Sequence, residues 1–188
     1  YSYLWKNKIR NKIRNKINIF IALPIVVEDS INILNVVSKI FFIKQRKNFK
    51  VFIKPHPTMK IEVLKKYLNK FDRKHFKITF GNIDKLLSIT DILISSMSIT
   101  CLEAIALGIP VINVKRSIGL SFNSIPKEIP REIWRHCSSE KEILNAINFF
   151  TYKLSIKSKS RQNIGKLVRK NYFEPVTKKK VINFLNLH

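Results

Sequence analysis

The stretch DILISSMSITCLEAIALGIPVINV, residues 91–114, contains segments typical of a strand, a turn, a helix and a second strand, in that order. Its first part, DILISS, is an apolar run of the kind that is buried on both faces of a parallel sheet. Ile99 to Leu107 follows as a helix, and Gly108 predicts the left-handed residue that ends it. Pro110 to Val114 is then expected to be the next strand. Together these segments predict a parallel β-α-β unit.

The rest of the chain repeats this alternation on both sides of the unit. Acidic and capping residues such as Glu28-Asp29-Ser30 separate a strand-like segment from a helix-like one. We therefore predict an α/β fold, a Rossmann-like doubly wound parallel sheet with helices on both faces and a helical C-terminal tail. The other strands are expected at Ile19–Val27, Phe49–Ile53 and His75–Phe80. The other helices are expected at Ile31–Arg46, Met59–Phe71, Ile83–Thr90, Glu140–Lys153, Ser158–Asn171 and Thr177–Leu187.

The charge of the chain is strongly positive. Its 188 residues include 36 Lys and Arg against 12 Asp and Glu, a formal net charge of +24. Such an excess raises nucleic acid or an anionic membrane surface as a partner. The lysines are scattered over every segment and accompany many Ile, Asn and Phe, which is also what an AT-rich genome produces. Composition alone therefore does not assign a nucleic-acid-binding function.

The cysteines and the apolar segments favour a cytoplasmic protein. Cys101 and Cys137 lack the spacing of a zinc site or a disulfide framework. No apolar stretch reaches the roughly 20 residues that a membrane-spanning helix needs. We therefore expect a cytoplasmic chain.

The N-terminal segment is unusually basic. NKIRNKIRNKI, residues 7–17, places Ile9, Ile13 and Ile17 on one side of a helix and cations on the rest. It is predicted to be a basic linker or an amphipathic helix, and Trp5 nearby keeps open a peripheral contact with the inner face of the cell membrane. We expect three parts: this segment at 1–17, a Rossmann-like domain at 18–154, and C-terminal helices at 155–188 packed on that domain.

Two prolines enclose a histidine directly after a predicted strand, in the sequence VFIKPHPTMK at residues 51–60. Proline fixes its own φ and pushes the preceding residue into an extended conformation. His56 is therefore expected in a stiff loop at the carboxyl end of the strand, with Lys54 beside it. Ligands of open α/β sheets bind outside these strand ends. The alternative is a simple turn whose histidine bonds the backbone.

A second polar group lies at the end of the DILISS strand. Ser95, Ser96, Ser98 and Thr100 are packed into one strand-to-helix turn. Free backbone N–H groups and the positive end of the helix dipole favour an anion there. We predict that these hydroxyls bind phosphate. Ordinary N-capping by Ser98 is the alternative.

One acidic residue lies in an otherwise apolar helix. Glu103 is surrounded in sequence by Leu102, Ala104, Ile105 and Ala106 and therefore needs a polar partner. A ribose diol could be that partner, and a salt bridge to a lysine is the alternative. The loop after the next predicted strand, which contains Lys115 and Arg116, is a candidate for further phosphate contacts.

These residues resemble a known enzyme family. The segment Asp91–Val114 is similar to the donor-site segment of GT-B glycosyltransferases, and KPHP is similar to the His-Pro motif of bacterial sialyltransferases, polysialyltransferases and capsule or surface polysaccharide biosynthesis proteins. The resemblance covers roughly Asn18 to Leu187 and corresponds to the C-terminal, nucleotide-sugar-binding half. The two motifs together are fairly specific, whereas each alone is weak.

The resemblance implies a function and roles for the site residues. It implies transfer of a sugar from a nucleotide-activated donor to a surface or capsular polysaccharide or glycolipid acceptor. His56 would contact the donor phosphate and help the nucleotide to leave, with Lys54 beside it. Glu103 would contact the ribose, and the serines and the threonine would hold phosphate. The donor would be linked to CMP, CDP or UDP.

One departure from the family limits what this chain could do. A whole GT-B enzyme has two Rossmann-like domains, and the acceptor site and usually the catalytic base lie on the N-terminal one. No such domain is recognisable here, and the chain begins at Tyr1, so we expect a fragment that binds the donor and needs a missing N-terminal domain. No DxD-like acidic pair follows a strand, and we expect no cofactor and no catalytic metal.

Two other functions stay open. UDP-N-acetylglucosamine 2-epimerases share the fold, but their Ser-Gly-Gly-x-x-Glu-Glu run is not matched, since Ala104 follows Glu103. A non-enzymatic basic module that binds nucleic acid or membrane is the second. Nucleic-acid binding is not expected, because aromatics are not interleaved with the cations and no groove-reading motif is present.

Overall fold

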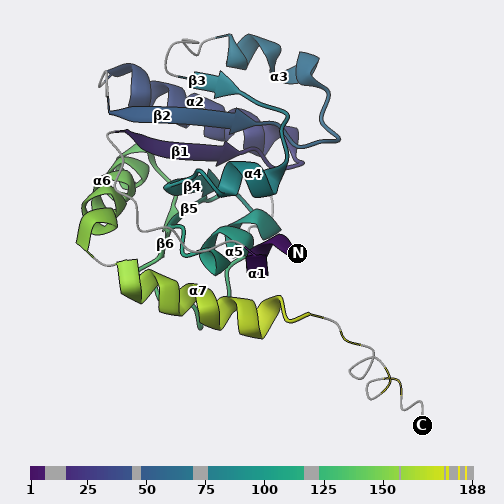
Figure 1. Ribbon diagram of the computed structural model, residues 1–188. Coiled ribbons are helices and arrows are strands. Elements are labelled where there is room, and N and C mark those ends of the chain that lie inside the picture. The colour runs from purple at the N-terminus through teal and green to yellow at the C-terminus, as the bar shows by residue number, and fades with distance from the viewer. Residues whose placement is uncertain are drawn as a thin grey trace.

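Six parallel strands form one sheet in a computed structural model of the chain (Figure 1). The structure describes residues 1–6, 16–43, 48–69, 76–116, 123–156, 158–175, 177, 182 and 185. The strand order is β3-β2-β1-β4-β5-β6, and every neighbouring pair is parallel. The strands are β1 Ile17–Ala22, β2 Phe49–Lys54, β3 Phe76–Ile78, β4 Ile92–Ser95, β5 Val111–Val114 and β6 Trp134–Cys137. This confirms the predicted Rossmann-like doubly wound fold.

Helices cover both faces of the sheet (Figure 1). They are α1 Tyr3–Lys6, α2 Val27–Ile43, α3 Ile61–Leu68, α4 Ile83–Leu87, α5 Ile99–Ala106, α6 Glu140–Ile156 and α7 Ser158–Tyr172. Successive strand residues point to opposite faces, so Ile19 and Ile21 pack with α2, α3 and α6. Phe20 packs on the other face, in a core with α1, α4, α5 and α7. Burial on both faces explains why the central strands are almost entirely apolar.

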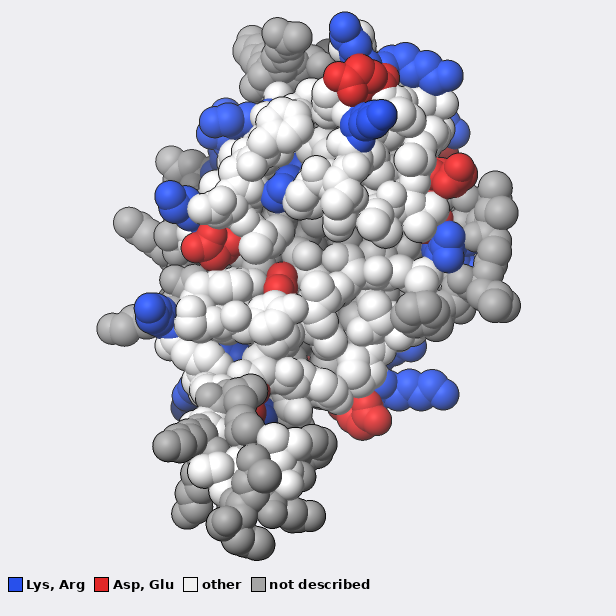
Figure 2. Space-filling view, turned by 90° about the vertical axis from the view of Figure 1, so that its right-hand side faces the viewer, with Lys and Arg blue, Asp and Glu red and all other residues white. Residues whose placement is uncertain are grey.

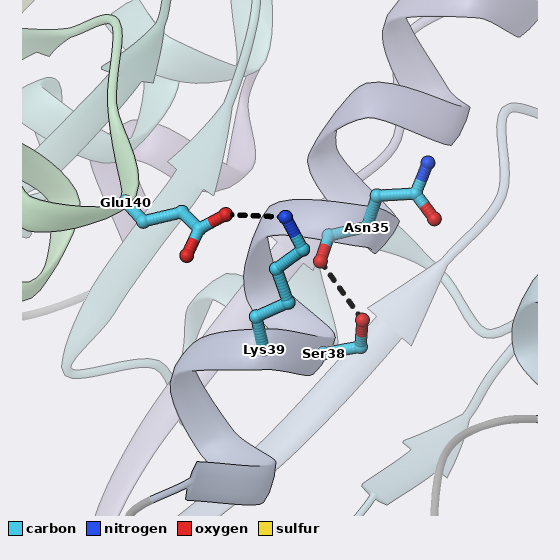
Figure 3. Close-up of polar contacts among 4 residues, drawn as sticks. All are labelled: Asn35, Ser38, Lys39 and Glu140. Atoms are coloured by element: carbon cyan, nitrogen blue, oxygen red, sulfur yellow. Dashed lines mark hydrogen bonds and ion pairs between the residues drawn. The ribbon is translucent and has the colours of Figure 1, made fainter.

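An ion pair on the surface joins the two longest helices of the first face. Lys39 of α2 and Glu140 of α6 are 2.7 Å apart, and both side chains are largely exposed. Figure 3 shows this pair beside Ser38, whose hydroxyl donates to the carbonyl oxygen of Asn35 within α2 at 2.8 Å. Exposed pairs of this kind contribute roughly 0–1 kcal/mol, so the buried apolar residues of α2 and α6 carry most of the stability of this contact.

Helix α7 packs directly on the carboxyl end of α5, and two glycines make this possible. Gly108 ends α5 with φ of 73°, as predicted for a left-handed cap. Gly165 of α7 approaches so closely that a Cβ placed there would lie 2.9 Å from the carbonyl oxygen of Ala106. The same Cβ would lie 3.0 Å from the amide nitrogen of Gly108. A side chain at Gly165 would therefore separate the two helices.

One predicted strand was too long, and one observed strand was not predicted. The strand expected at Ile19–Val27 ends at Ala22, and helix α2 begins at Val27. Pro24 has no N–H for the sheet, and its carbonyl oxygen instead accepts from the Ser30 hydroxyl at 2.9 Å. Strand β6, Trp134–Cys137, was not predicted at all. Its sequence WRHC has no alternating apolar pattern, and the strand exists because it pairs with β5 from Trp134 to Cys137.

Several helix bounds also differ from prediction. Helix α3 ends at Leu68, α4 ends at Leu87 and α6 extends to Ile156. In α4 the Thr90 hydroxyl donates to the carbonyl oxygen of Leu86 at 2.7 Å, which closes the helix before the predicted end. The expected basic helix at 7–17 lies largely outside the described residues, which include only Lys16 and Ile17 of this segment. The expected last helix at Thr177–Leu187 also lies largely outside them. The proposed division into three parts stays a prediction.

Candidate functional site

The sheet reverses its direction of winding between β1 and β4. From β1 the chain passes to β2 on one side, and from β4 it passes to β5 on the other. In such folds the crevice outside the carboxyl ends of the two strands is the usual place for a ligand. The strands point to the right in Figure 1, and Figure 2 looks onto that edge. The middle of this face carries few charged side chains, and most Lys and Arg lie toward its margin (Figure 2).

The two predicted motifs lie at this same edge. Ala22 of β1 is in register with Lys54 of β2, two residues before His56. On the other side of β1, the hydroxyl of Ser95 donates to the carbonyl oxygen of Ala22 at 2.7 Å. Lys54 and Ser95 therefore flank Ala22, and only one strand separates the histidine loop from the serine turn. The tertiary structure thus brings together two motifs that are about 40 residues apart in the sequence.

The histidine loop fixes one ring nitrogen of His56. The backbone N–H of Thr58 donates to His56 Nδ1 at 3.3 Å, and the Thr58 hydroxyl oxygen lies 2.8 Å from the same nitrogen. A nitrogen that accepts from a backbone N–H carries no proton of its own, so the neutral ring is protonated at Nε2. His56 is half-buried between Pro55 and Pro57. The loop therefore presents Nε2–H as a fixed hydrogen-bond donor, and contact with a phosphate stays a prediction.

The serine turn has one strained residue. Met97 has φ of 24°, a region that residues with a side chain rarely adopt. Such strain persists only where the surrounding structure enforces it, and it is common at binding sites. The turn leads into α5, whose first N–H groups have no partner within the helix. Sequence reasoning placed this turn correctly but missed the strain, because methionine gives no signal for a positive φ.

Two of the four predicted phosphate-binding hydroxyls have hydrogen-bond partners within the protein, and a third lies near Glu103. Ser95 is fully buried, and its hydroxyl donates to the carbonyl oxygen of Ala22. Ser98 is the N-cap of α5, where its oxygen accepts from the backbone N–H of Thr100 at 3.2 Å. The Thr100 side chain lies near Glu103 and lowers the pKa of that carboxyl group. These contacts explain structurally why the turn is rich in hydroxyls, and phosphate binding by the three residues stays a prediction.

Ser96 differs from the other three. It is 1% exposed, and its hydroxyl has no hydrogen-bond partner within the described part of the chain. A buried hydroxyl without a partner is costly in a folded protein, by about 1–3 kcal/mol. Such a group calls for an explanation. Ser96 is therefore the hydroxyl of this turn whose hydrogen-bonding capacity the described residues leave unused.

Glu103 faces the N-terminal helix. The carboxyl group is 5% exposed. Burial raises its pKa, and the nearby hydroxyls of Tyr3 and Thr100 partly oppose that shift. The Tyr3 hydroxyl is itself buried, and it faces the carboxyl group without the geometry of a full hydrogen bond. The described residues give Glu103 no ion pair with a lysine. Ribose contact by Glu103 stays a prediction, and sequence reasoning missed Tyr3.

The two cations after β5 have different surroundings. Arg116 Nε lies 2.8 Å from Asp29 Oδ2, and the Asp29 side chain is only 3% exposed. Asp29 belongs to the first turn of α2, after β1, so the ion pair crosses the end of β4 between them. Lys115 is exposed, and its backbone N–H donates to the carbonyl oxygen of Cys137. Sequence reasoning treated Asp29 as a capping residue and missed this pair.

Two further searches of the described residues are negative. They contain no group of three or more His, Cys, Asp or Glu side chains placed to hold a metal ion. None of their helices is both long enough and apolar enough to cross a bilayer.

Comparison with solved structures shows which proteins share this fold. No protein-family model and no curated protein matches the sequence. Among solved structures, the C-terminal domain of the group 1 glycosyltransferase LpcC from Francisella tularensis has a TM-score of 0.56 at 15% identity, over 91% of this chain and 95% of that domain. A glycosyltransferase from Rickettsia africae has a TM-score of 0.58 at 18% identity, over 94% of this chain and 50% of its own.

This chain has the Rossmann-like fold of GT-B glycosyltransferase domains. Another enzyme type has the same fold: the UDP-GlcNAc 2-epimerase from Neisseria meningitidis, solved with UDP-GlcNAc bound, has a TM-score of 0.56 at 16% identity, over 86% of this chain and 46% of its own. Identities this low establish the fold alone. The chain spans about half the length of the Rickettsia and Neisseria proteins.

Proposed function

We propose that this chain is the donor-binding half of a glycosyltransferase that uses a nucleotide-activated sugar. The observation that carries the proposal is the Ser96 hydroxyl, which is buried without a partner in a strained turn at the start of α5. That turn lies at the switch point of a Rossmann-like sheet, one strand away from the His56 loop. The comparison with glycosyltransferase domains of the same fold supports the proposal.

The proposed chemistry is displacement at the anomeric carbon of the sugar. An acceptor hydroxyl forms the new C–O bond while the bond from that carbon to the donor phosphate breaks, and the nucleotide leaves with the electron pair. The acceptor's proton passes to a base, which we place on a second domain. The charge that develops on the leaving phosphate is met by the N-terminal N–H groups of α5, by Ser96 and by His56 Nε2–H. Because these groups supply the stabilisation, the proposal needs no metal.

The substrates and partners belong to the proposal as well. The donor is linked to CMP, CDP or UDP, and the acceptor is a surface or capsular polysaccharide or a glycolipid. A second Rossmann-like domain completes the acceptor site, consistent with a chain that spans about half of its full-length structural neighbours. Lys115, at the exposed end of β5, is the cation of this edge that is free to move toward a phosphate, whereas Arg116 is held by Asp29.

A 2-epimerase is the second candidate, because an enzyme of that class bound to UDP-GlcNAc has the same fold with the same TM-score as LpcC. The residues after Glu103 argue against it, since Ala104 stands where the 2-epimerase motif has a second acid. Incubation with UDP-GlcNAc and no acceptor separates the two candidates. An epimerase inverts the C2 centre, which proton NMR detects, whereas a transferase leaves that centre unchanged.

Nucleotide binding tests the proposal directly. Thermal shift and calorimetry with CMP, CDP, UDP and GDP should show stabilisation by at least one of the first three. Ser96→Ala should weaken that nucleotide about tenfold or more, because a hydrogen bond to a charged phosphate is lost. It should leave the stability of the free protein unchanged or higher, because a hydroxyl without a partner is removed.

Ser38→Ala is the matched control. Ser38 is also a buried serine, but it lies in α2, more than two turns from the start of that helix. Its hydroxyl donates to the carbonyl oxygen of Asn35 (Figure 3). Its loss should leave nucleotide affinity unchanged. The proposal fails if no nucleotide stabilises the protein, or if the Ser96 and Ser38 variants bind it equally well.

A further inference from the structure

The N-terminal residues and the end of α7 form one cluster, and α7 itself lies on the side of the molecule opposite α3 (Figure 1). The indole Nε1–H of Trp5 donates to the carbonyl oxygen of Phe173 at 3.0 Å. Arg169 Nη1 donates to the carbonyl oxygen of Leu4 at 2.8 Å. The rings of Tyr1 and Phe173 are 5.1 Å apart. These contacts join both segments into a single surface, although they are more than 160 residues apart in sequence.

The α7 part of this surface is cationic. Helix α7, with the sequence SKSRQNIGKLVRKNY, contains five basic residues and no acidic one. Arg161 is buried and donates to the carbonyl oxygen of Lys153, so it belongs to the core side of the helix. Lys166 and Lys170 are exposed and one turn apart, on the outward side. Lys6, at the end of α1, is also exposed.

Large apolar side chains are exposed on the same surface. Trp5 is 45% exposed, Tyr172 is 42% exposed and Tyr1 is 63% exposed. Leu167, which lies between the two outward lysines in the sequence, is 52% exposed. Exposed Trp and Tyr beside Lys and Arg form the side-chain combination found at membrane–water interfaces, where the rings lie at the level of the lipid headgroups. A surface exposed only to water has no need of this combination.

We propose that this α7 surface, formed by Tyr1, Trp5, Lys6, Lys166, Leu167, Lys170 and Tyr172, binds a bilayer that contains anionic lipids. The lysines face the negative charge of the headgroups, which attracts each of them near the surface. The aromatic rings and Leu167 enter the headgroup region. The inference does not depend on the function proposed for the carboxyl edge.

The geometry favours a membrane over nucleic acid. Base stacking needs an aromatic ring with an accessible face, but the Arg169 guanidinium lies 5.9 Å from the centre of the Trp5 ring. The indole N–H is also already committed to Phe173.

Vesicle binding tests the proposal with the chain as it stands. The probes are phosphatidylcholine vesicles with and without phosphatidylserine, and binding is followed by co-sedimentation and by tryptophan emission. Trp134 is fully buried, so a shift of emission to shorter wavelength on binding reports Trp5. We expect binding only to the anionic vesicles. Trp5→Phe should abolish the emission shift.

Two charge reversals of equal size identify the surface. Lys166→Glu with Lys170→Glu should weaken binding to anionic vesicles about tenfold or more. Lys60→Glu with Lys65→Glu makes the same change of net charge on two exposed residues of α3, at its N-cap and within the helix, at the opposite end of the molecule. This double variant should weaken vesicle binding much less. Circular dichroism confirms that both double variants are folded.

Three outcomes overturn the proposal. The first is equal loss of binding in the two double variants, which would mean that net charge alone drives it. The second is equal binding to neutral and anionic vesicles. The third is binding of a single-stranded RNA oligonucleotide that depends on Lys166 and Lys170, without vesicle binding by the unaltered chain.

Discussion

The Tyr3 hydroxyl faces the Glu103 carboxyl group, and both are buried between α1 and α5. Burial raises the pKa of each group, and the charge of Glu103 raises that of Tyr3 further. The tyrosine thereby presents a hydroxyl to the carboxyl group for which a ribose contact is predicted. A ribose that binds Glu103 must therefore either displace Tyr3 or approach from the side of Thr100.

The raised pKa of Glu103 predicts a pH dependence of stability. The folded state holds this proton more tightly than the unfolded state, in which the pKa has its ordinary value of 4.5. The favourable contribution is complete below pH 4.5 and is lost as the pH rises through the folded-state pKa. Glu103→Gln keeps a neutral side chain at every pH. The free energy of unfolding of Glu103→Gln minus that of the unaltered chain should therefore increase with pH, as urea titrations would measure.

Glu142→Gln is a control with the opposite sign. Hydrogen bonds from Ser138 lower the pKa of Glu142, so its contribution is present above pH 4.5 and is lost as the pH falls. The stability of Glu142→Gln relative to the unaltered chain should therefore decrease with pH. A Glu103→Gln difference that follows the same direction as Glu142→Gln would show that Glu103 is not held in its protonated form by burial.

Gly165→Ala should destabilise the protein. Although alanine favours a helix by about 1 kcal/mol over glycine, its Cβ would meet backbone atoms of Ala106 and Gly108 that cannot move independently. We expect a net loss of about 1–3 kcal/mol from overpacking. Gly81→Ala is the control, because the added Cβ would meet nothing closer than the Thr79 hydroxyl at 3.4 Å. Thermal unfolding measures both, and equal midpoints would mean that α7 is not held closely against α5.

Met97→Gly should stabilise the protein or leave its stability unchanged. Glycine adopts φ of 24° without the clash that methionine suffers. The relief of this strain offsets the larger loss of backbone entropy of glycine, which is about 1 kcal/mol. Met97→Ala keeps the strain and removes only the rest of the side chain, so it should be the less stable of the two. Chemical denaturation orders the two variants, and a more stable alanine variant would show that Met97 is not strained.

The Asp29–Arg116 pair should contribute more than the Lys39–Glu140 pair. Asp29 is 3% exposed, and removing Arg116 leaves its charge buried without this partner. We expect each single alanine substitution to cost about 1–3 kcal/mol, with a coupling energy near 1 kcal/mol in a double-mutant cycle. The exposed Lys39–Glu140 pair should show a coupling of roughly 0–0.5 kcal/mol. Equal coupling energies would mean that the end of β4 is not closed by a buried ion pair.

Local features of the candidate site could be predicted from the sequence because they depend on a few neighbouring residues. Pro55 and Pro57 restrict the backbone around His56, and Gly108 supplies the positive φ that ends α5. The Ser-rich turn follows a buried strand whose apolar run is unmistakable. The partners of Ser95, Glu103 and Asp29 could not be predicted, because each contacts a residue that is distant in the sequence.

The sequence by itself determined the alternation of strands and helices, and hence the parallel sheet, because hydrophobic periodicity and turn residues act over a few positions. Tertiary structure alone decided that β6 is a strand, since its sequence lacks the pattern and its pairing with β5 supplies the hydrogen bonds. It also decided which hydroxyl of the serine turn has no partner. That depends on which carbonyl oxygens and amide groups the folded chain brings within hydrogen-bonding distance, and the buried Ser96 hydroxyl is left without one among the described residues.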